Sequence, residues 1–212
     1  MSASRAIRVF QKAAKEALDV RLSEGGILHA AVEVFAKRGF AATRVEDILE
    51  ASGIARRTFY KYFAGKEAVL ASIYEIATGE LLKAVAGAAR GEGADDPLSA
   101  LELGLDAYLD YHQAHGALVR ILAEQAIRTD SPLFPLRAQF RQSLVGVLDA
   151  AVQQARGEKL DPYFYVGLIS AVEGVSLELL SKKTPAAEVE RAKRALHLLL
   201  DRSLRAAAPT KR

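Results

Sequence analysis

The chain has 212 residues, of which 50% are hydrophobic and 26% are charged, and its net charge is +3 at pH 7. This composition supplies enough apolar side chains for one or two buried cores, and only six prolines argue against long disordered linkers. Because cysteine is absent, disulfides, thiolate zinc sites and cysteine nucleophiles are excluded.

The positive charge is concentrated near the N-terminus. Residues 1–66 hold 12 Lys and Arg against 7 Asp and Glu, whereas residues 67–212 hold 17 against 19. A basic module of this kind suits the phosphates of DNA, although a similar surplus is common on solvated helix faces. No run approaches about 18 consecutive apolar residues and no secretory signal is evident, so we expect a soluble, cytoplasmic protein with no membrane partner.

The first segment, residues 1–22, has an apolar stripe beside a basic face. Its basic residues are Arg5, Arg8, Lys12, Lys15 and Arg21, and its apolar residues include Ile7, Phe10 and Leu18. This spacing predicts an extra helix. We consider two roles for it, an added DNA contact and simple packing on the next domain.

A pair of short helices joined by a glycine turn is predicted within residues 43–63, after a supporting helix at residues 24–38 that stops at Gly39. We expect Thr43 and Glu46 to form a capping box at the start of the first helix, and Gly53 to end that helix in a left-handed conformation. The expected core of this three-helix unit comprises Ile27, Ala31, Phe35, Phe40, Val45, Ile48, Phe59 and Phe63.

The second of the two short helices carries Phe59 and Phe63 toward the core, and its other sides carry basic and aromatic residues. A glycine turn sets such a helix at a steep angle, so that it fits the DNA major groove. The segment therefore predicts a helix-turn-helix, a motif that binds double-stranded DNA.

The rest of the chain is predicted to be helical, with breaks at glycine and proline. We expect helices over about residues 66–89, from Pro97 to about 115, 117–127, 136–156, 161–181 and from Thr184-Pro185 to about 206. No strand pattern or repeat competes with this all-α assignment. The predicted domains are a basic helical extension (1–22), a helix-turn-helix domain (23–68), a C-terminal helical bundle (69–206) and a tail (207–212).

About the first 89 residues resemble the TetR family of bacterial transcriptional regulators. The run TFYKYF followed by Lys66-Glu67 is the most specific part of the resemblance. The other matching residues are Phe35, Gly39, Phe40, Thr43, Val45, Ile48, Ala51 and Gly53. Beyond them the chain matches the family only in architecture. The resemblance implies a C-terminal domain that binds a small-molecule effector and forms a homodimer.

The resemblance also assigns roles within the motif. It implies that Thr43, Tyr60, Tyr62 and Lys66 contact phosphates, which fix register without reading sequence. The candidates for base contacts are Arg44, Glu46, Arg56, Arg57, Thr58 and Lys61. The alternative for Arg56 and Arg57 is that they contact phosphates only. Ala55 stands where the family commonly has a capping serine, so the second motif helix is expected to lack a side-chain cap.

Polar and aromatic residues inside the apolar patterns of the second domain are candidates for an effector pocket. They are Tyr108, Tyr111, His112, Glu124, Gln125, Phe134, Phe140, Tyr165 and Glu173. Each of them is equally compatible with an ordinary core or surface position. His112 and His115 have a spacing that allows metal binding, but no third ligand is evident, so we expect no metal and no cofactor.

The implied mechanism is a switch in which an effector changes the separation of two DNA-binding motifs in a dimer, and so releases a palindromic operator. For the dimer we expect contacts from two helices, 136–156 and 161–181. The expected contact residues are Leu144, Val147, Leu148, Val152, Leu168, Val172, Val175 and Leu179.

Other functions share part of this pattern. A regulator that needs no ligand, or one that activates transcription, has the same features as a repressor. A helical-bundle enzyme is disfavoured because no phosphate loop or di-iron motif is found, and a lipid-binding bundle would not require the TFYKYF segment.

Overall fold

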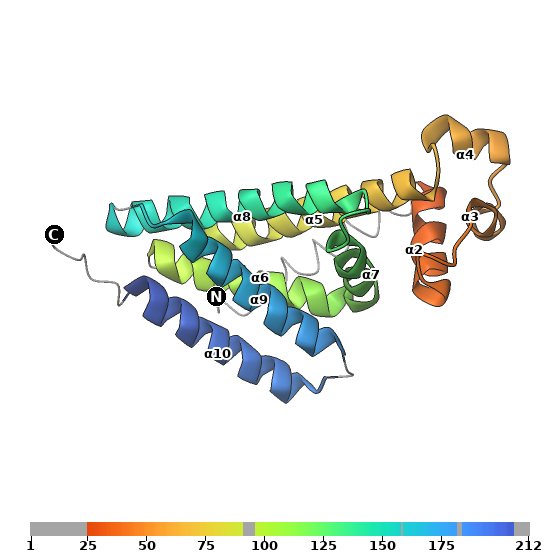
Figure 1. The fold of residues 1–212 in the computed structure, drawn as a ribbon. Helices are drawn as coiled ribbons and strands as arrows, with labels where there is room; N and C mark the ends of the chain where they lie inside the picture. Colours follow the sequence, from red (N-terminus) through yellow and green to blue (C-terminus); the bar gives the residue numbers. More distant parts are fainter. Residues whose placement is uncertain (1–24, 91–95, 158, 182–183, 206–212) are drawn as a thin grey trace. The chain divides into compact units, whose positions relative to one another are not determined.

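The computed structural model describes residues 25–90, 96–157, 159–181 and 184–205, and within these ranges it is all-α, as predicted (Figure 1). The predicted extension over residues 1–22 and the tail lie outside the described residues. The helices of the described ranges are α2 (Gly26–Arg38), α3 (Val45–Ser52), α4 (Arg56–Tyr62), α5 (Lys66–Arg90), α6 (Pro97–Ala114), α7 (Gly116–Ala126), α8 (Leu133–Arg156), α9 (Pro162–Ser181) and α10 (Ala186–Arg205).

Most helix starts follow the chemistry read from the sequence. Asp96 precedes α6, where its carboxylate accepts from the Ser99 amide at 3.0 Å and from the Ser99 hydroxyl at 2.9 Å. The start of α8 differs, because the helix begins at Leu133 and not at residue 136. Pro135 therefore lies in the first turn, where a missing N–H costs no helical hydrogen bond, and the Ser131 hydroxyl accepts from the Leu133 amide at 3.2 Å.

Two compact units divide the described chain. The first contains residues 25–81 with 115–140, and the second contains residues 82–114 with 141–205, where these are described. Helices α5 and α8 contribute residues to both units. The predicted domain bounds remain a prediction.

The core of the first unit is built mainly from the residues expected for it. Ile27, Ala31, Phe35, Ile48 and Phe59 are buried, whereas Phe40, Val45 and Phe63 are half-buried. The start of α5 adds Val69, Leu70 and Ile73, all fully buried. Each large aliphatic or aromatic side chain in such a core contributes on the order of 1.5–3 kcal/mol. This core fixes the orientation of the three short helices α2, α3 and α4.

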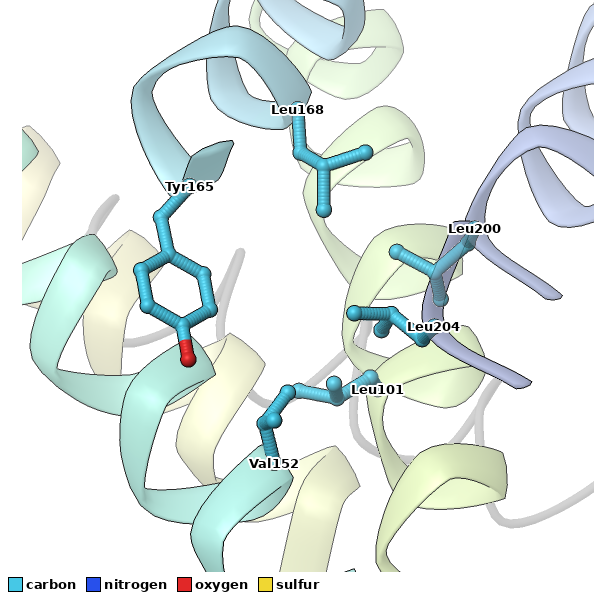
Figure 2. Packing of buried hydrophobic residues seen from close by; sticks show 6 residues of the cluster. All are labelled: Leu101, Val152, Tyr165, Leu168, Leu200 and Leu204. Carbon is cyan, nitrogen blue, oxygen red and sulfur yellow. The ribbon is translucent and has the colours of Figure 1, made fainter. Parts of the chain in front are cut away.

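The second unit is held by a buried cluster drawn from four helices, α6, α8, α9 and α10 (Figure 2). Its members are Leu101, Val152, Tyr165, Leu168, Leu200 and Leu204. The Tyr165 hydroxyl donates to the Asp149 carboxylate at 3.1 Å, which satisfies its only buried polar group. Burial, together with this hydrogen bond to a carboxylate, raises the pKa of Tyr165.

One helix of the described chain, α9, is long and apolar enough over Pro162–Leu180 to cross a membrane by length and composition alone. About a third of that stretch (33%) is buried within the chain. Its Glu173 forms an ion pair with Arg141 at 2.8 Å, and the helix packs against α6 and α10. These contacts join α9 to neighbouring helices of its own unit.

Candidate functional site

A tight turn joins α3 to α4. Gly53 adopts φ 66° and ψ 13°, and its amide donates to the Leu49 carbonyl at 3.0 Å, which ends α3 as predicted. An L side chain at this φ would be strained. Ala55 provides no side-chain cap, in line with the expectation, so the carbonyl of Ala55 alone begins α4 by accepting from the Thr58 and Phe59 amides.

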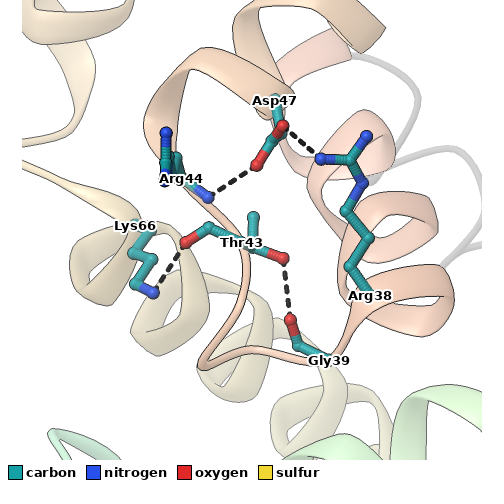
Figure 3. A network of polar contacts seen from close by, with 6 residues as sticks. All are labelled: Arg38, Gly39, Thr43, Arg44, Asp47 and Lys66. Carbon is teal, nitrogen blue, oxygen red and sulfur yellow. Dashed lines mark hydrogen bonds and ion pairs between the residues drawn. The ribbon is translucent and has the colours of Figure 1, made fainter.

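The start of α3 differs from the predicted capping box. Arg44, not Thr43, is the residue before the helix, and its backbone amide donates to the Asp47 carboxylate at 2.8 Å (Figure 3). The other oxygen of Asp47 accepts from Arg38 at 2.5 Å. The prediction was wrong by one residue because the Thr43 hydroxyl donates instead to the Gly39 carbonyl at 2.8 Å, inside the unit.

Lys66 holds the loop before α3. Its ammonium group donates to three carbonyl oxygens, at 2.9 Å to Phe40, 3.2 Å to Ala41 and 2.7 Å to Thr43. An ammonium group has three N–H donors, so these bonds use all of them. The same group lies 4.7 Å from the centroid of the Phe40 ring. In this structure Lys66 is thus a tether of the loop, and Thr43, which is 1% exposed, lies beneath it.

The outer face of α4 is basic and aromatic. Phe59 is fully buried, while its neighbours on the helix point outward. The exposed residues are Arg56, Arg57, Thr58, Tyr60, Lys61 and Tyr62, with Tyr62 64% exposed. A single aromatic anchor therefore fixes a seven-residue helix whose other side chains are available to a partner.

The two arginines of α4 differ in their contacts. Arg56 forms an ion pair with Glu46 of α3 and lies against the ring of Tyr60, with its guanidinium 5.3 Å from the ring centroid. The hydrogen bond from Arg56 lowers the pKa of Glu46, so the pair stays charged. Arg57 makes no side-chain hydrogen bond or ion pair within the described ranges. Lys61 lies over the Tyr62 ring at 5.6 Å.

The second unit contains an apolar cavity of about 70 Å³ that is partly open to the surface. Aliphatic side chains form almost the whole wall, and Tyr108 and Gly104 are the exceptions. The lining residues are Val85, Leu101, Gly104, Leu105, Tyr108, Leu144, Val147, Leu148, Leu168, Ile169, Val172 and Leu200. The second unit thus contains a partly open hollow whose wall is almost wholly apolar.

Of the nine residues proposed for an effector pocket, Tyr108 lines this cavity. Tyr111 and His112 are also buried in α6, and the His112 Nδ1 atom lies 2.5 Å from the Ser176 hydroxyl oxygen. Tyr165 belongs to the core cluster, and Glu173 is paired with Arg141. These contacts give the four residues structural roles.

The remaining four candidates lie in the first unit. Gln125 and Phe140 are buried there, whereas Glu124 and Phe134 are exposed. The cavity wall is aliphatic, so the polar residues in the helical pattern do not mark it. The one available signal in the sequence is Gly104, a glycine on the same side of α6 as Leu101, Leu105 and Tyr108.

Among the described residues no group of three or more His, Asp or Glu is arranged to hold a metal ion. His112, one half of the H-x-x-H pair, is instead engaged with Ser176.

Comparison with known proteins decides the family. Residues 27–73 match the sequence profile of the family described as bacterial regulatory proteins, tetR family. The HTH-type transcriptional repressor SCO4008 of Streptomyces coelicolor is 30% identical over 143 residues, which are 66% of this chain and 69% of that protein. The chain belongs to the TetR family.

Two further comparisons define how far the similarity extends. The HTH-type transcriptional regulator EthR of Mycobacterium tuberculosis is 28% identical over 140 residues, which are 66% of this chain. The chain spans 64% of EthR and smaller parts of several other curated relatives. The fatty acid degradation regulator FadR from Bacillus halodurans shares the fold, with a TM-score of 0.71 at 20% identity over 84% of this chain and 97% of that one. All three named proteins are regulators, not enzymes.

In this TetR-family chain the residues expected at a dimer contact face mostly inward. Leu144, Val152, Leu168 and Leu179 are buried, and Val147, Leu148 and Val172 line the cavity. The expected residues lie on the apolar side of each helix, and this side packs within the chain's own second unit. The outward sides of α8 and α9 carry other residues. They include Gly146 on α8 and Tyr163, Val166, Gly167, Ser170, Gly174 and Leu177 on α9, all exposed.

Proposed function

We propose that the chain is a DNA-binding regulator of transcription in the cytoplasm, with α4 entering the major groove of double-stranded DNA. The observation that carries this proposal is the outer face of α4, where basic and aromatic side chains surround one buried anchor, Phe59. A major groove about 12 Å wide admits such a helix. Family membership supports the same reading.

Within this face we propose a division of roles. Arg57 reads a base, since its guanidinium is exposed and can donate two hydrogen bonds to guanine O6 and N7. Arg56 is held by Glu46 and so presents only part of its fork of donors. Tyr60 and Tyr62 contact phosphates, while Arg44, Thr58 and Lys61 lie where they reach bases or the backbone.

Thr43 and Lys66 are assigned to phosphates by the family resemblance, but their polar side-chain groups are engaged inside the unit. We propose that both act indirectly, by holding the loop from which α3 begins. This assignment predicts a loss of stability, without a change in salt dependence, when Lys66 is removed.

We propose further that two copies form a homodimer through the outward faces of α8 and α9. A Cβ atom built on Gly146, Gly167 or Gly174 would meet nothing within 4 Å in the chain. Glycine inside an exposed helix costs roughly 1 kcal/mol relative to alanine, and nothing in the described part of the chain approaches the space that these side chains would fill. Close approach of helices from a second copy accounts for them, and a two-fold dimer predicts a palindromic operator.

The proposed activity is repression, relieved when a small molecule occupies the cavity of the second unit. SCO4008 is named a repressor, which favours this direction. An activator, or a regulator without an effector, would bind DNA in the same way.

The test is fluorescence anisotropy of a labelled fragment from upstream of the chain's own gene, titrated with the full-length protein. We expect saturable binding that survives excess unrelated competitor DNA and weakens steeply with salt. Equal competition by unrelated DNA would contradict sequence-specific regulation.

A further inference from the structure

The cavity of the second unit has a wall without charge. Ten of its twelve lining residues are aliphatic, Gly104 adds backbone, and Tyr108 is the one lining residue with a polar side chain. No carboxylate, ammonium, guanidinium, amide or imidazole group lines it. A charged ligand group placed there would lose its hydration without gaining a partner, which is strongly unfavourable.

The floor of the cavity is the hydrophobic core itself. Leu101, Leu168 and Leu200 line the cavity and also belong to the buried core cluster (Figure 2). Apolar walls of this kind offer no hydrogen-bond partner to water and favour apolar molecules. A ligand group bound here would extend the core, so its affinity would come from apolar contact.

One side of the cavity is closed by the approach of α6 to the end of α5. A Cβ atom at Gly104 would lie 3.2 Å from Cγ1 of Val85 and 3.5 Å from the Val85 carbonyl oxygen. The absence of a side chain at Gly104 thus permits the contact that bounds the cavity.

The volume limits the size of the group that the cavity can surround, and the rest of a larger molecule can extend through the open side. A site needs about 10–15 Å³ of this volume to hold one water-sized group. The cavity of about 70 Å³ therefore accepts roughly five to seven such groups, comparable to a chain or ring of about six carbon atoms.

We propose that this cavity binds an uncharged aliphatic group of about six carbon atoms, which belongs to the effector. The part of the effector inside the cavity is then apolar and uncharged, and polar recognition contributes little to the affinity of that part. This inference rests on the proposed function only in calling the occupant the effector, because the binding itself is independent of DNA.

The experiment is calorimetric titration of the full-length protein, without DNA, with 1-alkanols from propanol to decanol. Each buried methylene is expected to tighten binding about fourfold, until the gain levels off near six carbons. Hexanoate and hexylammonium are the charged arms, and each is expected to bind at least about tenfold more weakly than hexanol. Affinity that is independent of chain length, or equal for hexanol and hexanoate, would overturn the proposal.

A matched pair of variants locates the site. Leu148→Phe adds volume at the cavity wall and should weaken hexanol binding at least about tenfold, whereas Leu199→Phe makes the same change on the exposed side of α10 and should not. Val172→Leu is the smaller wall substitution, to be used if circular dichroism shows that Leu148→Phe is misfolded. Equal hexanol binding by a folded wall variant and the wild type would place the alkanol elsewhere and overturn the assignment.

The DNA titration described above is run on the same preparations. Chain-length-dependent alkanol binding without DNA binding would contradict the proposed function and leave the cavity assignment intact. DNA binding without alkanol binding would contradict the cavity assignment and leave the proposed function intact.

Discussion

At the residue scale, two neighbouring arginines on α4 differ in their side-chain contacts when no DNA is bound. Arg56 is paired with Glu46 across the turn, whereas the Arg57 side chain is exposed and makes no polar contact in the described part of the chain. The guanidinium of Arg56 is fixed by its ion pair, whereas that of Arg57 has all five N–H donors available for DNA. Arg57 is therefore the better candidate for a base contact.

Replacing Arg57 with Ala should weaken binding to the specific site by roughly 1–3 kcal/mol and relax preference at one base pair, because the bidentate contact is lost. Binding to unrelated DNA should change much less. Anisotropy on both DNAs measures this, and Arg191→Ala, an exposed arginine on α10, is the control. An equal loss on both DNAs would assign Arg57 to a phosphate.

Lys66→Met should lower the free energy of unfolding by roughly 1.5–3 kcal/mol, since three charge-assisted hydrogen bonds to the loop are removed. The matched control is Lys61→Met, which removes an exposed ammonium group and should change stability by less than about 0.5 kcal/mol. Urea unfolding measures both.

The salt dependence of DNA binding then separates the two roles of Lys66. A tether leaves the slope of log K against log salt unchanged in the folded variant, whereas a phosphate contact would reduce the slope by about one. A reduced slope for Lys66→Met would refute the role of Lys66 as a tether of the loop.

At the element scale, helix existence and most helix ends follow from local sequence. Some structural features depend only on contacts between residues close in sequence, and the sequence predicts these directly. Examples are Gly53, Asp96-Pro97 and the TFYKYF run. The predicted Thr43–Glu46 cap is wrong because the Thr43 hydroxyl donates to the Gly39 carbonyl, and the carboxylate that accepts from the cap amide is that of Asp47. Arg38, which lies nine residues before Asp47, pairs with Asp47. The local sequence pattern around residue 43 does not predict a contact with a residue on the preceding helix.

The candidate pocket also depends on contacts between residues far apart in the sequence, which local pattern does not predict. Polar residues within apolar helical patterns predict ligand contacts, yet the side chains of Tyr165 and Glu173 bond to Asp149 and Arg141 of their own unit. Which aliphatic residues leave a space between them depends on how α6, α8 and α9 pack, and periodicity identifies only that they are buried. Among the residues that line the cavity, Tyr108 is the one that the sequence proposes for an effector pocket.

The contact between α10 and α6 should be sensitive to pH. The His197 Nε2 atom lies 2.9 Å from the Asp106 carboxylate, and this hydrogen bond raises the pKa of His197 against the opposing effects of burial and of Lys193. Glu102 also faces the imidazole and raises its pKa. Because the folded pKa exceeds the unfolded one of about 6.5, the stabilisation is complete below that pH and is lost as the pH rises through the folded value.

Wild type should therefore exceed His197→Gln in free energy of unfolding by more at pH 6 than at pH 9. Urea denaturation at the two pH values measures the difference. His29→Gln, at an exposed histidine of α2, is the control. A stability gap that widens toward pH 9 would show that His197 acts through its neutral form.

At the scale of the whole molecule, the proposed dimer depends on faces that the chain leaves uncovered. Gly167, Ser170, Gly174 and Leu177 recur at intervals of three or four residues and so share one face of α9. Small residues along a helix face allow another helix to approach closely.

Gly174→Leu should convert the dimer to a monomer at micromolar concentration while each chain stays folded, because the added side chain meets no atom of its own chain at Cβ. Light scattering gives the mass and circular dichroism the helix content. Ala36→Leu, on the exposed side of α2, should remain dimeric. A wild-type monomer, or a dimeric Gly174→Leu variant, would count against this face.

The central claim is that two copies of α4 read one palindromic site, and hydroxyl-radical footprinting upstream of the chain's own gene tests it most directly. We expect two symmetric protected regions on one face of the DNA, with centres about one helical turn (10–10.5 base pairs) or a multiple of it apart. Protection confined to a single half-site, or spread evenly along the fragment, would contradict the claim.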